Sequence, residues 1–197
     1  MKKPNHSGSG QIRIIGGQWR GRKLPVPDSP GLRPTTDRVR ETLFNWLAPV
    51  IVDAQCLDCF AGSGALGLEA LSRYAAGATL IEMDRAVSQQ LIKNLATLKA
   101  GNARVVNSNA MSFLAQKGTP HNIVFVDPPF RRGLLEETIN LLEDNGWLAD
   151  EALIYVESEV DGLPTVPANW SLHREKVAGQ VAYRLYQREA QGESDAD

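Results

Sequence analysis

The sequence lacks any apolar run of 18 residues, roughly the length that a membrane-spanning helix requires. Its first ten residues are polar and contain no apolar segment of the kind found in a secretion signal. An internal repeat is also absent. These absences predict a cytoplasmic protein of one domain, because 197 residues fall within the usual size of a single domain.

Cysteine and histidine are scarce. The two cysteines, Cys56 and Cys59, have the C-x-x-C spacing of redox and metal sites. They fall within an expected strand and its tip, not at a helix N-terminus that would lower a thiol pKa. His6, His121 and His173 have no paired spacing, whereas a structural zinc site usually needs four ligands. The sequence therefore predicts two buried, reduced thiols and no metal.

Basic residues are scarce beyond the first forty positions. The net charge is −2, yet residues 1–40 contain nine Lys or Arg against two Asp. Residues 41–197 contain twelve basic and 21 acidic residues. This asymmetry indicates an arm that faces a polyanion and is attached to an acidic body.

Residues 12–24 of this arm alternate basic and apolar side chains around glycines, which predicts a small hairpin. Basic side chains can contact phosphates, and an exposed indole can stack on an unpaired base. A basic surface that is merely solvated is the alternative. The candidates for contact with a nucleic acid are Arg13, Trp19, Arg20, Arg22 and Lys23.

Short apolar runs alternate with helical stretches, the pattern of an α/β fold with a parallel sheet covered by helices on both faces. The expected strands are residues 54–58, 78–83, 103–107, 122–127 and 153–158, and the expected helices are residues 65–76, 85–99, 110–117 and 134–145. Residues 170–177 and 181–187 predict a closing antiparallel hairpin. The expected architecture is a doubly wound, Rossmann-like sheet, mostly parallel, with a C-terminal antiparallel hairpin.

A further helix is expected within residues 33–47, after Pro34, with Thr35, Thr36 or Asp37 as its N-cap. Four segments follow from the whole pattern. They are a disordered tail at residues 1–10, a basic hairpin extension at 11–32, a main domain at 33–188 and a disordered acidic tail at 189–197.

A glycine-rich loop follows the first expected strand of the main domain. Gly62, Gly64 and Gly67, with Ser63 between them, fit a G-x-G-x-x-G spacing, which lets a backbone approach a ligand above a helix N-terminus. A dinucleotide explains this spacing equally well. Asp58, at the strand tip, favours S-adenosylmethionine over a dinucleotide. Its charge repels a pyrophosphate and attracts the ammonium and sulfonium groups of S-adenosylmethionine. It can also satisfy backbone N–H groups of the loop.

The next two expected strands end in residues that suit a nucleoside. Glu82 lies about 20 residues beyond the glycines and is assigned to ribose hydroxyls, while Asp84 is expected to cap the following helix. Met83 is assigned to adenine, with core packing as its alternative. Asn109, followed by Ala110, is also assigned to adenine, with an N-cap as its alternative.

The residues Asp127-Pro128-Pro129-Phe130 follow the apolar run at 122–126. Two adjacent prolines lack backbone N–H groups and cannot continue a central strand. The Asp127 carboxylate and the Pro128 carbonyl can accept hydrogen bonds from a planar NH2 group, and Phe130 can stack on a base. An Asp that caps a Pro-Pro turn is the alternative. Because a glycine-rich loop lies upstream, methyl transfer to an amino nitrogen is favoured.

Together these motifs resemble the class I S-adenosylmethionine-dependent methyltransferases. Residues 33–47, 57–64 and 127–130 resemble the RsmD family in particular, and the resemblance extends over residues 12–187. It implies S-adenosylmethionine as the methyl donor and the 2-amino group of one guanine in small-subunit (16S) ribosomal RNA as the acceptor. It also suggests a ribosomal substrate that contains protein.

Three more basic residues are candidates for contact with RNA. Arg131 and Arg132 directly follow the expected catalytic corner, from which they can clamp phosphates beside a base flipped out of a loop or bulge. Arg38 is expected either to close over the cofactor or catalytic loop or to contact RNA, and the sequence leaves both roles open.

Other functions are weighed against this one. Related sites methylate adenine in nucleic acids or glutamine in proteins, but Phe130 and Asp127 stand here in place of the commoner Tyr and Asn. Asp58 opposes a NAD-dependent oxidoreductase, and the intact motif opposes a noncatalytic RNA-binding assembly factor. A monomer is expected.

Overall fold

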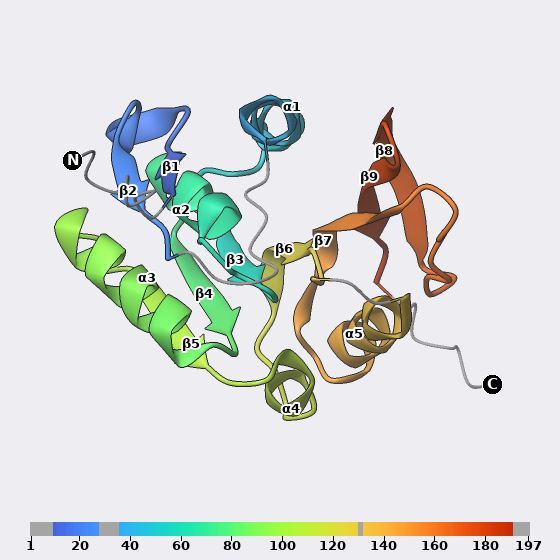
Figure 1. The fold of residues 1–197 in the computed structure, drawn as a ribbon. Coiled ribbons are helices and arrows are strands. Elements are labelled where there is room, and N and C mark those ends of the chain that lie inside the picture. The colour runs from blue at the N-terminus through green and yellow to red at the C-terminus, as the bar shows by residue number, and fades with distance from the viewer. Residues whose placement is uncertain (1–9, 28–35, 130–131, 191–197) are drawn as a thin grey trace, which may run out of the picture.

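The computed structural model describes residues 10–27, 36–129 and 132–190 of the chain. Its centre is a seven-stranded sheet of order β5-β4-β3-β6-β7-β9-β8 (Figure 1). The strands are β3 (Gln55–Asp58), β4 (Gly77–Glu82), β5 (Ala103–Asn107), β6 (His121–Val126), β7 (Leu148–Glu159), β8 (Trp170–Ala178) and β9 (Val181–Arg188). The first five in spatial order are parallel, and β9 runs antiparallel to β7 and β8. The predicted doubly wound sheet with a closing hairpin is confirmed.

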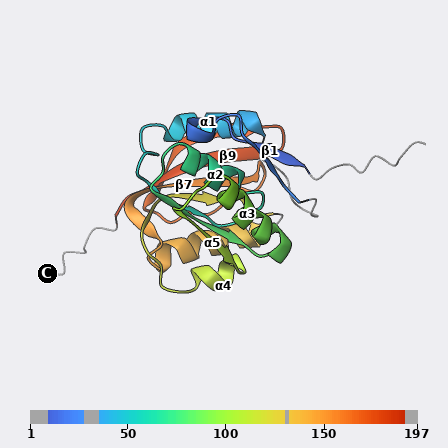
Figure 2. The same cartoon turned by 90° about the vertical axis from the view of Figure 1, so that its left-hand side faces the viewer.

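Helices cover both faces of this sheet (Figures 1 and 2). One face packs against α1 (Asp37–Leu47), α2 (Ala65–Ser72) and α3 (Arg85–Thr97), and the other packs against α4 (Ala110–Leu114) and α5 (Arg132–Asp144). The alternating side chains of the central strands divide between two cores, since Cys56 and Phe125 join the first and Leu57 and Val124 the second. Burial on both faces explains why these strands read as continuous apolar runs.

Several element bounds differ from the sequence-based expectation. Helix α2 ends at Ser72, four residues early, because Tyr74 has a φ of 71°, which a right-handed helix cannot contain. Helix α4 ends at Leu114 instead of residue 117. Strand β7 begins at Leu148 instead of residue 153, since Leu148 already pairs with His121 before a register shift in the ladder. The other bounds agree within two residues.

The helix expected within residues 33–47 begins at Asp37. Thr36 is its N-cap, and its hydroxyl accepts the Val39 N–H at 3.4 Å. The apolar face is buried as expected, with Leu43 and Phe44 among the least exposed side chains of the protein.

The N-terminal extension forms a two-stranded antiparallel sheet of β1 (Gln11–Arg13) and β2 (Lys23–Pro25). The predicted hairpin is confirmed, but a 3-10 helix, η1 (Gly17–Trp19), occupies its connection. The extension is built into the protein, because its apolar side chains belong to the first core. These are Ile12, Ile14, Leu24 and Val26.

Glu69 of α2 anchors this extension. Its carboxylate is fully buried and accepts the backbone N–H groups of Ile15 at 3.0 Å and Gly16 at 2.9 Å. Arg73 donates to the same carboxylate at 3.0 Å, and the buried Arg40 lies 3.7 Å from it. Two backbone N–H groups and two arginine side chains thus offset the free-energy cost of burying the Glu69 charge.

No described helix has the length and apolarity needed to cross a membrane.

Replacing Glu69 by Gln should lower the free energy of unfolding by about 2–4 kcal/mol, because Arg40 and Arg73 would lose their buried counter-charge. Urea unfolding followed by circular dichroism measures this change. Glu41→Gln on the exposed side of α1 is the matched control, and its effect should stay within about 0.5 kcal/mol. Equal midpoints for both variants would contradict the anchoring role.

Candidate active site

A cavity of about 890 Å³ opens at the carboxyl ends of the parallel strands. Strands β4 and β6 flank β3, and the direction in which the chain builds the sheet reverses between β3 and β6. Open α/β sheets bind ligands at such a switch point. Ten of the predicted site residues line the cavity, namely Asp58, Gly62, Ser63, Glu82, Met83, Asn109, Ala110, Asp127, Pro128 and Pro129.

The glycine-rich loop turns tightly between β3 and α2. Gly62 and Gly64 have φ values of 55° and 81°, and Gly64 is the N-cap of α2. A Cβ atom on Gly64 would lie 2.5 Å from Leu91 Cδ2, and one on Gly67 would lie 2.7 Å from Leu80 Cδ2. Gly64 and Gly67 therefore serve the packing of α2 against its neighbours, while Gly62 and Ser63 face the cavity.

Asp58 is buried at the tip of β3, and its Oδ2 accepts the Gly67 N–H at 3.2 Å. The expected role toward the loop backbone is thus present. The pKa of Asp58 is raised to about 7, because burial and, to a lesser extent, the nearby Glu82 charge outweigh the opposing backbone hydrogen bonds from Gly67 and Phe60. A cation placed beside this carboxyl group would favour its ionised form.

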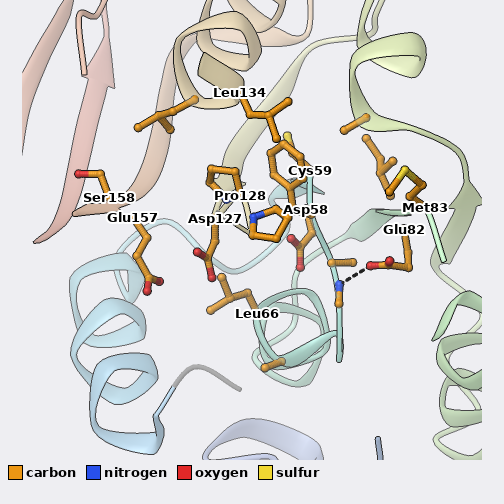
Figure 3. A pocket seen from close by; sticks show the side chains of 18 of the residues that line it. Asp58, Cys59, Leu66, Glu82, Met83, Asp127, Pro128, Leu134, Glu157 and Ser158 are labelled. Atoms are coloured by element: carbon orange, nitrogen blue, oxygen red, sulfur yellow. Dashed lines mark hydrogen bonds between the residues drawn. The ribbon is translucent and has the colours of Figure 1, made fainter. Parts of the chain in front are cut away.

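Glu82 ends β4 beside the loop, and Figure 3 shows its carboxylate bonded to the Gly62 backbone. One oxygen accepts the Gly62 N–H at 2.8 Å, and the other accepts the Asp84 N–H at 3.1 Å. Asp84 caps α3 by accepting the Val87 N–H, as predicted. Met83 is 67% exposed on the cavity side, so core packing, the alternative considered for it, is wrong.

Asn109 caps α4, which confirms the second of its two expected roles. Its Oδ1 accepts the N–H groups of Met111 at 2.8 Å and Ser112 at 3.3 Å. The Nδ2 group lies 3.9 Å from Met83 Sδ, at the cavity wall. Since Oδ1 already has two donors, the group that Asn109 presents to a ligand is a donor and not an acceptor.

Asp127 and Pro128 follow β6 directly, and Pro129 completes the corner. Burial raises the pKa of Asp127 well above its ordinary range, and the neighbouring charges of Glu157 and Asp58 add to the rise. Figure 3 shows the Asp127 side chain between Asp58 and Glu157. This part of the cavity thus offers acceptors for hydrogen bonds, in accord with a ligand that carries an amino group.

Some predicted residues lie elsewhere. Phe130 and Arg131 fall outside the described residues, as does the side chain of Arg132, the first residue of α5. Arg38 is exposed on α1, one residue into the helix. Exposed positions are also found for Arg13, Arg20, Arg22 and Lys23.

Trp19 is only half exposed, because its ring packs against the first core. Its backbone N–H donates to the Ser72 hydroxyl at 3.0 Å. Arg13 lies 3.7 Å from Asp37, so its charge is partly engaged within the protein.

Both cysteines are buried free thiols, as expected. Burial raises the pKa of Cys56 to about 12 and that of Cys59 well above its ordinary value. Within residues 10–27, 36–129 and 132–190 there is no group of three or more potential metal ligands.

Glu157 is a site residue that the sequence analysis missed. It lies near the carboxyl end of β7 and lines the cavity, and its charge contributes to the raised pKa of Asp127. Its signal in the sequence was an acid at the end of an apolar run, the same signal that identified Asp58, Glu82 and Asp127.

A family model described as "Conserved hypothetical protein 95" matches residues 12–187. The chain belongs to this family. The match confirms the RsmD-family resemblance over the predicted range.

Relatives include "Ribosomal RNA small subunit methyltransferase D" of Escherichia coli (strain K12), 99% identical over 198 residues and 100% of both chains. The protein of the same name from Haemophilus influenzae is 55% identical over 95% of this chain and 100% of its own.

Solved structures share the fold. The Escherichia coli protein yhhF superposes with a TM-score of 0.89 at 96% identity, over 92% of this chain and 100% of that one. An RNA methyltransferase from Salinibacter ruber, in complex with S-adenosyl-L-homocysteine, has a TM-score of 0.63 at 12% identity. It covers 84% of this chain and 99% of its own, and at this identity the likeness concerns the methyltransferase fold alone.

Replacing Gly64 by Ala should lower the free energy of unfolding by about 1–3 kcal/mol, because a left-handed φ costs an L-residue about 1–2 kcal/mol and the new methyl would press on Leu91. Thermal unfolding measures the change. Gly101→Ala is the matched control, since an added Cβ there meets nothing within 4 Å and its φ is not left-handed. A Gly64 variant as stable as the Gly101 variant would show that the loop can relax.

Proposed function

We propose that this protein transfers a methyl group from S-adenosylmethionine to the 2-amino group of a guanine in small-subunit (16S) ribosomal RNA. The observation that carries the proposal is the meeting of Asp58 with the Asp127-Pro128 corner in one cavity at the switch point of the sheet. The names of the relatives, which describe ribosomal RNA small-subunit methyltransferases, support the substrate class.

The residues fit S-adenosylmethionine in chemistry and charge. Asp58 would attract its ammonium group, the backbone at Gly62 and Ser63 would approach it closely, and Met83 would lie on adenine. Glu82 would accept from the ribose hydroxyls with the lone pairs that Gly62 and Asp84 leave available. Asn109 would donate its Nδ2–H to a ring nitrogen of adenine, since its Oδ1 caps α4.

Charge favours this cofactor over a dinucleotide. A pyrophosphate at the loop would meet the carboxyl groups of Asp58 and Glu82, and the Glu82 charge already contributes to the raised pKa of Asp58. S-adenosylmethionine has no phosphate, and its cations would relieve the same repulsion.

The part of the cavity lined by Asp127 and Pro128 would activate the amine of the methyl acceptor. An amino nitrogen on a purine delocalises its lone pair into the ring, so it is a poor nucleophile until its N–H bonds are held by acceptors. The Asp127 carboxyl and the Pro128 carbonyl would hold these N–H bonds and direct the lone pair outward. When bound, S-adenosylmethionine supplies an electrophilic methyl carbon and leaves as S-adenosylhomocysteine. The proton that N2 then loses would pass to Asp127 or to water, and Phe130 would stack on the base.

RNA contact is assigned to the basic residues of the N-terminal extension and its surroundings. Arg13, Arg20, Arg22 and Lys23 lie on one two-stranded unit that Glu69 anchors to α2, the helix that follows the cofactor loop. RNA held there would have a fixed position relative to the cavity. Trp19, Arg38, Arg131 and Arg132 complete the proposed set.

Incubation with radiolabelled S-adenosylmethionine tests the function. The acceptors are small ribosomal subunits, stripped ribosomal RNA and genomic DNA, all from cells that lack the protein. Label is expected in 2-methylguanosine of small-subunit RNA. Asp127→Ala should reduce turnover by at least about 100-fold, because acceptors for the amine act mainly in the transition state. Cofactor affinity should be unchanged.

The matched control is Asp144→Ala, an exposed acid at the last position of α5, and it should retain normal turnover. Label confined to DNA would overturn the substrate assignment. Normal turnover by Asp127→Ala would overturn the mechanism.

Below pH 7, cofactor affinity should decrease as the pH decreases, by up to about tenfold per pH unit. The pKa of Asp58 is raised to about 7 by burial, so the carboxyl binds a proton below this pH, and the proton competes with the cation of the cofactor. Calorimetry between pH 5.5 and 7.5 measures the slope. Asp58→Asn should bind weakly with little pH dependence, whereas Asp127→Asn should keep the wild-type slope. A flat wild-type profile would contradict the pairing of Asp58 with a cation.

A further inference from the structure

A second carboxyl group accompanies Asp127 at the acceptor end of the cavity. Strands β6 and β7 are parallel neighbours with Val126 opposite Val156, so Asp127 and Glu157 occupy the next position outward on each strand. Both line the cavity, and Figure 3 shows their carboxyl groups side by side. After burial, the charge of Glu157 is the largest cause that raises the pKa of Asp127.

Tyr155 orients the side chain of Glu157. The hydroxyl of Tyr155, a fully buried residue two positions back on the same strand face, donates to Glu157 Oε2 at 3.2 Å. Tyr155 itself belongs to the core that α1 covers. The carboxyl group of Glu157 is therefore oriented by a rigid partner, beside the carboxyl group of Asp127.

The stability of the fold alone does not explain why two carboxyl groups are buried side by side here. Burial is the main reason that both groups have raised pKa values, and an apolar pair of similar volume at such a position is often as stable or more so. Two adjacent acceptors of this kind suit a ligand that brings two adjacent donors.

We propose that Glu157 selects guanine by accepting its N1–H, while Asp127 and the Pro128 carbonyl hold the neighbouring 2-amino group. The proposal rests on the function proposed above and names the residue that reads the base. Guanine presents N1–H and N2–H next to each other on its Watson–Crick edge. Adenine and cytosine instead present a ring-nitrogen lone pair beside their amino group.

Glu157 therefore disfavours adenine and cytosine as well as binding guanine. A carboxylate that faces the lone pair of adenine N1 or cytosine N3 would lose its hydrogen bond and meet like charge density, which is costly in a half-buried site. The Asp-Pro corner by itself holds any planar amino group, so the choice between bases needs a second residue. Glu157 stands where that second contact would fall.

The base 2-aminopurine tests this inference, since it keeps the 2-amino group of guanine but has a lone pair at N1. Once the methylated guanine is mapped, small-subunit RNA is ligated with guanine or 2-aminopurine at that position and assembled into subunits. Wild-type protein should prefer guanine by about 10- to 100-fold in kcat/KM, the value of one hydrogen bond to a charged group.

Glu157→Gln should reduce this preference to a few-fold, because the amide can turn its NH2 group toward the lone pair of 2-aminopurine. Cofactor affinity should stay at the wild-type value. Glu151→Gln, an exposed position on the same strand at the opposite end, is the matched control and should keep the full preference. If Glu157→Gln has no measurable turnover, competition binding with the two RNAs makes the same comparison without chemistry.

Equal methylation of guanine and 2-aminopurine by wild-type protein would overturn the inference and leave the proposed function intact. An undiminished preference in Glu157→Gln, in turnover or in binding, would also overturn it. Absence of label in guanine with wild-type protein would instead overturn the proposed function, and the role of Glu157 with it.

Discussion

Repulsion among acidic groups at the carboxyl ends of the parallel strands is the constraint on which the site depends. Asp58, Glu82, Asp127 and Glu157 end or follow four neighbouring strands, and the order of those strands brings them to one cavity. Burial raises the pKa of Asp58, Asp127 and Glu157, and repulsion from neighbouring acids adds to the rise for Asp58 and Asp127. A folded protein retains such a cluster only where rigid neighbours hold it, which here are the central strands and the glycine-rich loop.

The cluster divides into two functional halves. Asp58 and Glu82 accept backbone N–H groups of the loop, so their charges are partly neutralised before any ligand binds. Asp127 and Glu157 lie beside each other, and the Tyr155 hydroxyl donates to Glu157. A cationic cofactor at the first half and an amine at the second would each remove part of the repulsion, which couples the binding of the two substrates through charge.

One further buried acid, which lies outside the cavity, connects the N-terminal extension to this site. Glu69 lies on α2, two residues beyond Gly67, the donor to Asp58, and holds the extension through Ile15 and Gly16. The basic surface of the extension and the glycine-rich loop therefore belong to one rigid unit. In the mechanism proposed above, this arrangement would fix the distance between bound RNA and the methyl donor.

The sequence by itself determined the alternation of strands and helices, the glycine-rich loop, the cap Asp84, and the acids at three strand ends. These features are local, because apolar period, turn residues and caps act over a few neighbouring positions. Only the tertiary structure decided that Glu157 faces Asp127, that Glu69 anchors a strand pair 53 or 54 residues away, and that Asn109 uses its oxygen as a cap. The first two depend on which strands lie side by side and on how buried charges are paired across the chain. The first of them follows from the position of β6 between β3 and β7, and no short stretch of sequence encodes that order.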